Sequence, residues 1–417
     1  MVKLDKISFY DAREKALKEV YPKKISEIVL LENGLFRVLS KDIICKKNLP
    51  SFDNSAMDGF AFRFEDRGKK LKIALKIFTG DKPKSILKEG ECYQIMTGAK
   101  VPKDVDTIAP IENCIVYDNG FVEVPKDIKR GSSLRLKGEE QKEGNILLKK
   151  GTLIQPDDIA LLASQGIIAV DVYKKLSIAV VSTGDEIREP WDEADEDEIY
   201  NANAFGIISM LKKFGFESSY IGAIPDNFEE TIEFIKKLNS YDAIITTGGI
   251  SMGEADFLNK AFIKNGLNSF FHGVMVKPGR PTMMGKMGKT FVMAMPGNPL
   301  TSLINTFLLS LPVLFKMQGS LKYHFNFTYA KNIKEVNLKS GRTNILLGSV
   351  ENGEFEVINN NKYGSGMITP MCLSNSVAIF DANISKVGKD ELIKVILLDS
   401  FALTKKDNNI NWTLCLT

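Results

Sequence analysis

Histidine is nearly absent from this sequence of 417 residues, which contains two, His272 and His324. Catalytic systems that pair histidine with serine or cysteine use the imidazole as a base, and many zinc sites use it as a ligand. No His-Glu-x-x-His motif is present either. The chemistry is therefore expected to depend on carboxylates with a metal ion and on fixed cations.

Cysteine is also scarce, and its spacing argues against two kinds of structural site. The five cysteines are odd in number, widely separated and contain no Cys-x-x-Cys motif: Cys45, Cys92, Cys114, Cys372 and Cys415. A disulfide framework or a zinc cage is not expected from this pattern. Free thiols of this kind favour a reducing compartment, so the predicted location is the cytoplasm.

The sequence also lacks a large excess of charge of one sign and long apolar runs. The formal net charge is +3, with lysines and acids interleaved, so a nucleic-acid partner is not expected. The first residues lack the apolar core of a signal peptide. The most apolar helix candidate, residues 303–315, contains Asn305 and Pro312 and is interpreted as too short to span a membrane. No membrane partner is predicted.

The sequence divides into four regions that differ in their pattern of apolar and polar residues. Residues 176–320 alternate apolar strands with amphipathic helices, which predicts a doubly wound, mostly parallel sheet. The predicted fold class is multidomain α/β plus β, with four domains. They are a discontinuous helical domain (1–45 and 146–172), a β-rich insertion (46–145), a doubly wound α/β domain (173–325) and a small C-terminal β-barrel-like domain (326–417).

A glycine-rich segment, Thr246-Thr247-Gly248-Gly249-Ile250-Ser251-Met252-Gly253, follows a short apolar run that predicts a buried strand. Loops at the carboxyl ends of parallel strands bind ligands, and glycine lets phosphate oxygens approach the main chain. Backbone donors from Gly248, Gly249, Ser251 and Gly253 would suit a phosphoester. The alternative interpretation, a strand-to-helix turn capped by Asp256, fits this segment equally well. Gly288-Lys289-Thr290, in contrast, precedes a strand and lacks the first P-loop glycine, so it predicts a hairpin turn.

Acidic side chains follow three successive predicted strands. Asp185 and Glu186 follow the first, Asp226 the second and Asp256 the third. The ends of parallel strands meet at one edge, so these acids can converge, and carboxylates together with substrate phosphate suit Mg²⁺. Helix caps and turn acids would explain any one of them. The acid-rich run from Asp185 to Glu198 is interpreted as a solvated, mobile loop.

Six blocks of the sequence together resemble one family. Besides the glycine-rich segment, they are Pro50 to Ala61, Ile95 to Ala99, Val181 to Glu186, Lys277-Pro278-Gly279-Arg280-Pro281 and Met295-Pro296-Gly297-Asn298-Pro299. They resemble the molybdopterin molybdenumtransferases, the family of bacterial MoeA and the gephyrin E domain. The blocks occur in the family's order and cover most of the chain. The resemblance therefore carries expectations about the whole protein.

The resemblance implies roles for particular residues. Asp58, Thr97 and Glu186 would be catalytic, together with Asp226 and Asp256, which would also bind Mg²⁺. The segment Pro296, Gly297, Asn298 and Pro299 would contact substrate. A molybdate site would be lined by Lys277, Arg280, Thr301, Arg342 and Ser365. Relatives more often have lysine at 280, serine at 301 and an aspartate in place of Glu140, so the role of Glu140 is open.

The implied function is a step in molybdenum cofactor biosynthesis. The enzyme would insert molybdate into adenylylated molybdopterin and release AMP by hydrolysis, with Mg²⁺ as cofactor. A homodimer with composite active sites is expected, in contact with a molybdopterin adenylyltransferase. Two alternatives are the adenylyltransferase itself, which resembles residues 176–320 alone, and a non-catalytic scaffold of the gephyrin E-domain kind. The Asp58 and Thr97 motifs disfavour the first, and the retained acids disfavour the second.

Overall fold

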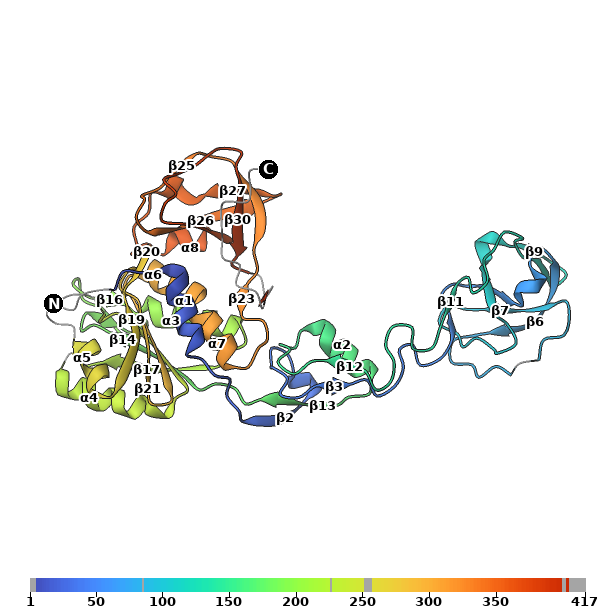
Figure 1. Ribbon diagram of the computed structural model, residues 1–417, viewed down its shortest axis with the longest axis horizontal. Coiled ribbons are helices and arrows are strands. Elements are labelled where there is room, and N and C mark those ends of the chain that lie inside the picture. The colour runs from blue at the N-terminus through green and yellow to red at the C-terminus, as the bar shows by residue number, and fades with distance from the viewer. Residues whose placement is uncertain (1–4, 85, 226, 251–256, 400–402, 405–417) are drawn as a thin grey trace. The chain divides into compact units, whose positions relative to one another are not determined.

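The chain forms two compact units in the structure, which is a computed structural model (Figure 1). Residues 5–84, 86–225, 227–250, 257–399 and 403–404 are described. One unit comprises Asp42–Lys149 and Leu161–Gly166. The other comprises the chain up to Lys41, then Lys150–Ala160, and the chain from Ile167 onward. The boundaries of the four predicted domains stay a prediction.

The smaller unit is built on a mixed six-stranded sheet. Its order is β8 (Thr107–Pro110), β5 (Gly59–Phe62), β7 (Glu91–Ile95), β6 (Lys70–Ile77), β10 (Phe121–Glu123) and β9 (Ile115–Tyr117). All neighbours are antiparallel except β6 and β7. Successive residues of β5 enter different cores, because side chains alternate across a strand: Phe60 and Phe62 pack on one face and Ala61 on the other. Two short ladders, β4 (Asn54–Ser55) with β11 (Leu134–Arg135) and β3 (Ile43–Ile44) with β12 (Ile146–Leu148), complete the unit.

A second six-stranded sheet forms the α/β part of the larger unit. Its order is β17 (Ser218–Ile224), β14 (Ile178–Thr183), β18 (Ala243–Thr247), β22 (Thr290–Met295), β21 (Met283–Met287) and β19 (Leu267–His272). The first four strands are parallel, and β21 pairs antiparallel with both β22 and β19. The predicted mostly parallel sheet is confirmed. Met287 pairs with Thr290, so the predicted hairpin turn at 288–289 is confirmed too.

Helices cover both faces of this sheet, and the strand residues show why. Ile178 and Val180 of β14 enter one core, and Ala179 and Val181 enter the other. The first core is covered by α1 (Phe9–Lys18), α3 (Ala202–Lys213), α6 (Pro299–Asn305) and α7 (Leu311–Met317). The second is covered by α4 (Phe228–Lys237) and α5 (Phe257–Lys264) (Figure 1). A sheet that is buried on both faces explains the near-continuous apolar runs of its strands.

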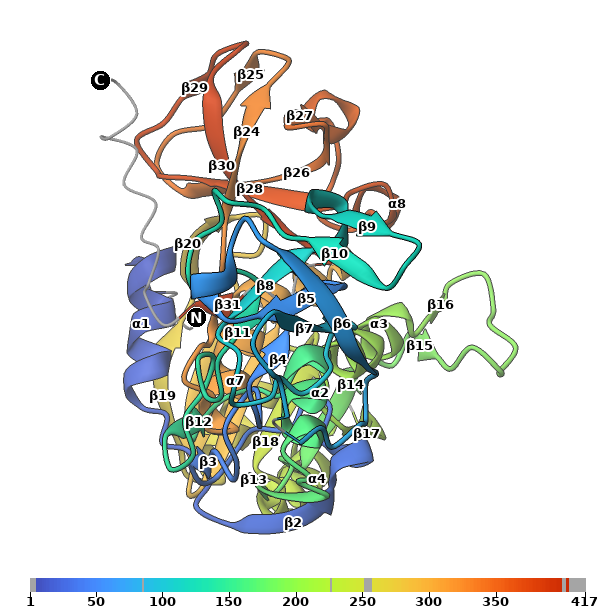
Figure 2. The same cartoon turned by 90° about the vertical axis from the view of Figure 1, so that its right-hand side faces the viewer.

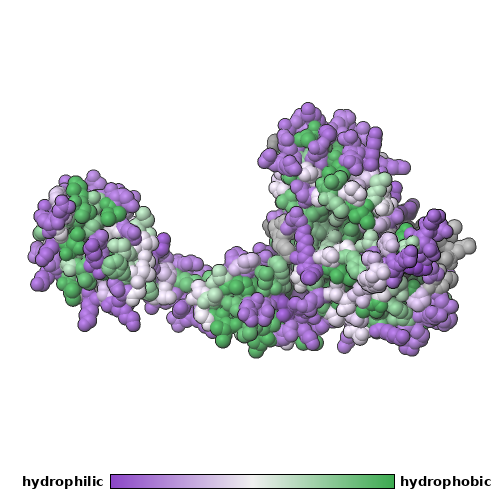
Figure 3. All heavy atoms as spheres, turned by 180° about the vertical axis from the view of Figure 1, so that it is seen from behind, coloured by the Kyte–Doolittle hydropathy of each residue, from purple (hydrophilic) through white to green (hydrophobic). Residues whose placement is uncertain are grey.

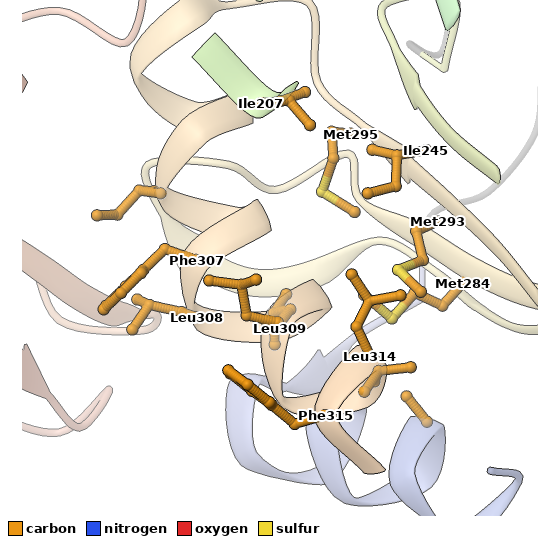
Figure 4. Packing of buried hydrophobic residues seen from close by; sticks show 14 of the residues in the cluster. Ile207, Ile245, Met284, Met293, Met295, Phe307, Leu308, Leu309, Leu314 and Phe315 are labelled. Atoms are coloured by element: carbon orange, nitrogen blue, oxygen red, sulfur yellow. The ribbon is translucent and has the colours of Figure 1, made fainter. Parts of the chain in front are cut away.

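The helix predicted near 303–315 is longer than the sequence suggested. It runs from Pro299 to Met317, 19 residues, which is long and apolar enough to cross a membrane, and 89% of it is buried inside the protein. The interpretation as too short was therefore wrong. A π-helical segment, Thr306–Ser310, ends two residues before Pro312, and its wider turn accommodates the missing N–H donor of proline. Figure 4 shows Phe307, Leu309 and Leu314 of this helix packed in the core that contains Ile245 and Met293 of the sheet.

A closed barrel of five strands forms the C-terminal part. Its strands pair in the order β26 (Thr343–Glu351), β27 (Glu354–Val357), β24 (Thr328–Asn332), β30 (Leu392–Leu397) and β28 (Ser376–Phe380), and β28 pairs back to β26. The predicted barrel-like domain is confirmed. One further strand, β20 (Val274–Lys277), pairs in parallel with β26 and aligns Lys277 with Asn344. This pairing brings the segment after β19 against the barrel.

A further two-stranded ladder and a short helix are formed by residues 26–30 and 156–173. β2 (Ser26–Leu30) and β13 (Ala169–Tyr173) are antiparallel, and α2 (Pro156–Ser164) precedes β13. Several apolar side chains of the ladder are exposed, including Ile28 at 72% and Leu30 at 54%. Figure 3 shows apolar side chains gathered on the surface over β2 and β13. The ladder therefore presents an apolar face to the surroundings.

Candidate active site

The larger of two adjacent cavities lies at the carboxyl ends of the parallel strands β14, β18 and β22. Its volume is about 630 Å³. It is lined by the segments 183–187, 199–203, 247–250 and 296–299, with Ile224, Pro225, Thr231, Leu258 and Pro281. Strand ends are where open α/β sheets bind ligands. The predicted substrate residues Gly248, Gly249 and Pro296–Pro299 and the predicted catalytic Glu186 all line this cavity.

The residues after β18, Gly248 to Ile250, form a turn that is called the glycine turn below. Gly248 lies too close to the end of β14 to carry a side chain. A Cβ on Gly248 would lie 2.5 Å from the hydroxyl oxygen of Thr183, and Gly248 has a φ of +92°. The N–H of Gly248 donates to the carbonyl of Met295 at 3.1 Å. The side-chain amide of Asn203 donates to the Thr247 hydroxyl and to the Gly297 carbonyl, both at 2.7 Å. These contacts fix three cavity loops to one another.

Four predicted residues of this region, Asp226, Ser251, Gly253 and Asp256, lie outside the described residues. The predicted metal ligands are among them, so their assignment stays a prediction. Within the described ranges, no group of three or more histidine, cysteine, aspartate or glutamate side chains could hold a metal ion. Asp185 and Glu186, which line the cavity and are exposed, supply the carboxylate oxygens that Mg²⁺ prefers.

The acid-rich run, interpreted as a solvated, mobile loop, is anchored at both ends, and most of its residues between these ends are exposed. β15 (Ile187–Arg188) pairs with β16 (Ile199–Tyr200), and Arg188 forms an ion pair with Glu198. Glu189 accepts hydrogen bonds from Tyr220 and from the Asn201 amide. Burial and then this carboxylate raise the pKa of Tyr220 to about 12. The segment between the two strands extends beyond α3 (Figure 2).

The smaller cavity, about 390 Å³, collects most of the predicted molybdate residues. Lys277, Thr301, Arg342 and Ser365 line it, together with residues of β20, β26 and the 361–364 segment. They meet here because β20 pairs with β26, which brings Lys277 beside the strand that follows Arg342. Arg280 is described but is not among the lining residues, and its buried Nε has no hydrogen-bond partner in the described part of the chain. Its role stays a prediction.

The two cavities share a wall made by Pro281, Pro296 and Asn298. Asn298 donates a hydrogen bond from its side-chain amide to the hydroxyl of Ser365 at 2.8 Å. Its carbonyl accepts a hydrogen bond from the Thr301 hydroxyl at 2.7 Å. One ligand that extended past Asn298 would therefore contact both cavities.

Comparison with known proteins gives the same family over most of the chain. Three family models match: the MoeA N-terminal region (domain I and II) at residues 7–166, a probable molybdopterin binding domain at 179–316 and the MoeA C-terminal region (domain IV) at 329–398. A molybdopterin molybdenumtransferase of Haemophilus influenzae is 32% identical over 396 residues, which covers 92% of this chain and 96% of that protein. The chain belongs to the molybdopterin molybdenumtransferase family.

Further relatives agree with this assignment. A molybdopterin molybdenumtransferase of Synechococcus elongatus is 30% identical over 345 residues, covering 79% of this chain and 85% of that protein. The crystal structure of a molybdopterin biosynthesis MoeA protein from Pyrococcus horikoshii superimposes with a TM-score of 0.80 at 26% identity, covering 94% of this chain and all of that one. The protein is therefore an enzyme, a transferase of molybdenum cofactor biosynthesis that acts on molybdopterin. The matches outside 179–316 disfavour the adenylyltransferase alternative.

The other pair of residues that the molybdenumtransferase family implies, Asp58 and Thr97, lies in the smaller unit. Oδ1 of Asp58 accepts hydrogen bonds from the backbone N–H of Thr97 at 2.6 Å and from its hydroxyl at 2.8 Å. These two donors, the backbone one first, lower the pKa of Asp58 below its ordinary value. The pair forms because β5 and β7 are adjacent and place Gly59 opposite Ile95. Glu140 is exposed, and its role stays open.

Some residues of the two cavities were not predicted from the sequence. Asn203 ties the loops of the larger cavity, and Tyr363 lines the smaller one and accepts a hydrogen bond from the Leu347 N–H at 2.9 Å. Asn201 could have been found, because asparagine before an amphipathic helix is a typical N-cap and its side chain does accept from the Ala204 N–H. No local pattern indicates Asn203 or Tyr363, since both contact segments distant in the sequence.

Proposed function

We propose that this enzyme inserts molybdate into adenylylated molybdopterin, with hydrolysis of the adenylyl phosphoanhydride and release of AMP. The observation that carries the proposal is the common wall of the two cavities at Pro281, Pro296 and Asn298. A pterin nucleotide in the larger cavity and an oxyanion in the smaller one would be neighbours there. Holding two reactants side by side lowers the entropic part of the barrier to their reaction.

The larger cavity suits the pterin nucleotide in size and in chemistry. Its volume of about 630 Å³ is in the range of small-molecule sites. The glycine turn brings main chain to the wall of the cavity, and phosphate oxygens bind unpaired backbone N–H groups of such turns. The N–H of Gly248 is not one of these, because it donates to the Met295 carbonyl. Ile187, Ile199 and Tyr200 supply an apolar wall of the kind that planar rings pack against. These features support the predicted substrate role of Gly248, Gly249 and Pro296–Pro299.

The smaller cavity suits a compact oxyanion. Lys277 and Arg342 are cations, and Thr301 and Ser365 have hydroxyl groups that can donate hydrogen bonds to oxygen. A guanidinium presents several fixed donors, so Arg342 can hold two oxygens of one anion. Positive charge and hydrogen-bond donors together suit a small oxyanion, which supports the assignment of this cavity to molybdate.

Mg²⁺ is part of the proposal. When bound it would neutralise phosphate charge and so favour attack by water. Asp226 and Asp256 are the proposed ligands, and the exposed carboxylates of Asp185 and Glu186 line the same cavity. The cationic residues of the smaller cavity would hold molybdate without this metal. Asp58, whose pKa is lowered by its two hydrogen bonds from Thr97, is proposed as a further catalytic carboxylate.

We also propose that the enzyme works in the cytoplasm as a homodimer with composite sites. The apolar face of the β2–β13 ladder supports a dimer, because exposed apolar patches often mark protein–protein contacts. Ile28 and Ile168 are 72% and 78% exposed there. Contact with a molybdopterin adenylyltransferase, which would supply the adenylylated substrate, is proposed as well. Nucleic-acid and membrane partners are not part of the proposal.

A direct assay tests the proposed reaction. The purified protein is incubated with adenylylated molybdopterin, Mg²⁺ and molybdate, and both AMP and molybdenum cofactor are measured. The expected result is formation of both products, dependent on each of the three components. A control with unmodified molybdopterin and ATP should give no adenylylated product. Release of AMP without cofactor, or no turnover at all, would contradict the proposal.

A further inference from the structure

His272 is a buried side chain at the end of β19, 7% exposed. Its backbone is fixed by Asp5. The backbone N–H of His272 donates to the Asp5 carboxylate at 2.8 Å, and its carbonyl accepts from the Asp5 N–H at 2.7 Å. These two hydrogen bonds fix the backbone that carries the imidazole, which lies beside the face of the sheet that α5 covers.

Both ring nitrogens of His272 face a polar group of another segment. Nε2 lies 3.2 Å from the carbonyl oxygen of Ile250, and Nδ1 lies 3.5 Å from the amide nitrogen of Asn259 in α5. A carbonyl only accepts hydrogen bonds, so Nε2 must carry the proton. Nδ1 then faces the side-chain amide of Asn259. The contact with the Ile250 carbonyl thus places a proton on Nε2.

The carbonyl that His272 binds belongs to the glycine turn of the larger cavity. Gly248, Gly249 and Ile250 line this cavity in succession. The N–H of Gly248 is held by the Met295 carbonyl at 3.1 Å, and the carbonyl of Ile250 is held by His272. Glycine has more backbone freedom than any other residue, so a turn with two glycines keeps one shape only when its ends are held.

We propose that His272 is a positioning residue that fixes the glycine turn in the shape that binds the phosphate part of the pterin nucleotide. This rests on the proposed function, because it takes the larger cavity as the nucleotide site. Without the Nε2 donor, the turn would populate other shapes, and the nucleotide would have to select the competent one at a cost in affinity. The molybdate cavity does not contain this turn, so its affinity should be unaffected.

Three variants test the proposal. His272→Phe keeps a ring of similar size and removes both nitrogens. His272→Gln keeps a donor at a similar reach. His324→Phe is the matched control, because His324 is the second histidine of the chain, is equally buried at 6% exposure and does not line either cavity. Thermal unfolding of all three reports whether each variant is folded.

The expected result is a split between the two substrates. His272→Phe should raise the KM for adenylylated molybdopterin and the Kd for AMP, measured by calorimetry, by roughly three- to tenfold, the factor for a hydrogen bond of ordinary net strength. The KM for molybdate should not change. His272→Gln should recover most of the lost affinity, and His324→Phe should bind AMP as the wild type does.

Nitrogen-15 NMR of the histidine rings gives a test that needs no activity. The chain has two histidines, so comparison with His272→Gln assigns the signals of His272. We expect a proton on Nε2 of His272. A proton on Nδ1 alone would overturn the proposal, and so would wild-type AMP affinity in a folded His272→Phe. A wild type that binds neither AMP nor adenylylated molybdopterin would instead contradict the proposed function.

Discussion

The side-chain amide of Asn298 donates a hydrogen bond to the hydroxyl of Ser365 at 2.8 Å and so links the loop before α6 to the segment before β28. Asn298 is the N-cap of α6, yet its side chain makes no capping hydrogen bond. Asparagine is among the best N-cap residues, and a cap is worth about 1 kcal/mol. The side chain of Asn298 therefore connects the two cavities and leaves the helix end to other groups.

Replacing Asn298 and Ser365 one at a time should show which cavity binds which substrate. Ser365→Ala should raise the KM for molybdate by roughly threefold to tenfold, since one hydrogen-bonding group is lost, and leave the KM for the pterin nucleotide unchanged. Asn298→Ala should raise both constants, because Asn298 lines both cavities. Steady-state kinetics with one substrate varied at a time measures each value.

Two controls accompany these variants: the unfolding free energy of Asn298→Ala and the kinetics of Ser349→Ala. Asn298→Ala removes the exposed hydrogen bond to Ser365 but no helix cap, so it should lower the unfolding free energy by about 1 kcal/mol or less. Ser349→Ala, on β26 and away from both cavities, should leave both KM values unchanged. An effect of Ser365→Ala on the nucleotide alone would contradict the assignment of the cavities.

Arg342 should set the affinity for molybdate. Arg342→Ala removes charge-assisted donors from the smaller cavity and is expected to raise the molybdate concentration required for half-maximal cofactor formation by about 10- to 100-fold. Arg342→Lys should recover part of this, because lysine keeps the charge without the planar donor set. AMP affinity, measured by calorimetry, should stay at the wild-type value.

Two comparisons make the Arg342 result specific. Lys339→Ala removes an exposed cation from the same segment and should have no effect, since Lys339 does not line the cavity. Arg280→Ala should raise the molybdate requirement less than Arg342→Ala, because Arg280 is not a lining residue. If Lys339→Ala raised the molybdate requirement as much as Arg342→Ala, the cause would be a general loss of positive charge and not the loss of a contact with molybdate.

Tyr220 should titrate well above an ordinary tyrosine. Burial, followed by the hydrogen bond to Glu189, raises its pKa to about 12, compared with about 10 in an unfolded chain. The unfolded state therefore loses this proton first as the pH rises. The corresponding contribution to stability is present below about pH 10 and is lost as the pH rises through about 12.

Ultraviolet titration of the phenolates measures this group. The wild-type curve minus the Tyr220→Phe curve should show one tyrosine with a midpoint near pH 12. Glu189→Gln should move that midpoint down, because the carboxylate is the second cause of the shift, while burial keeps it above the ordinary value. A difference curve centred near pH 10 would show that Tyr220 is not held as described.

The sequence predicted the α/β sheet well because the signals there are local. Strands such as β14 and β18 are short apolar runs, and the glycine turn after β18 has the spacing of a ligand-binding loop. Gly248 shows why the residue type is fixed, since a Cβ would lie 2.5 Å from the Thr183 hydroxyl. The confirmed α/β sheet thus follows from short apolar runs that alternate with amphipathic helices and from turn residues, all visible in one sequence.

Other features depend on contacts that no local pattern reveals. The pairing of β20 with β26 places Lys277 and Arg342 in the lining of one cavity, whereas Arg280, which the family resemblance implied for the same site, is not in that lining. The helix through Pro312 was predicted too short, because proline usually ends a helix and the π segment before it compensates. Asn203 and Tyr363 belong to the cavities only through tertiary structure.

The last prediction concerns the subunits. Asp58 and Thr97 lie in one compact unit, and both cavities are lined by residues of the other. We expect a homodimer in which Asp58 of one subunit completes the site of its partner, so that two-fold symmetry gives two equivalent sites. Asp58→Ala and Asp256→Ala chains, each inactive alone, are mixed under conditions that allow subunit exchange.

Shared sites predict recovery of activity in the mixture. In a mixed dimer, one site receives both lesions and the other receives neither, so the intact site should work. With random exchange, half of the dimers are mixed and each has one intact site of two, which gives about a quarter of wild-type activity. A chain that carries both substitutions, mixed with either single variant, should recover nothing, because every site then contains a lesion. Exchange is verified by mass spectrometry of differently tagged chains. If mixed dimers form and AMP release stays at the level of the single variants, each site is built within one chain.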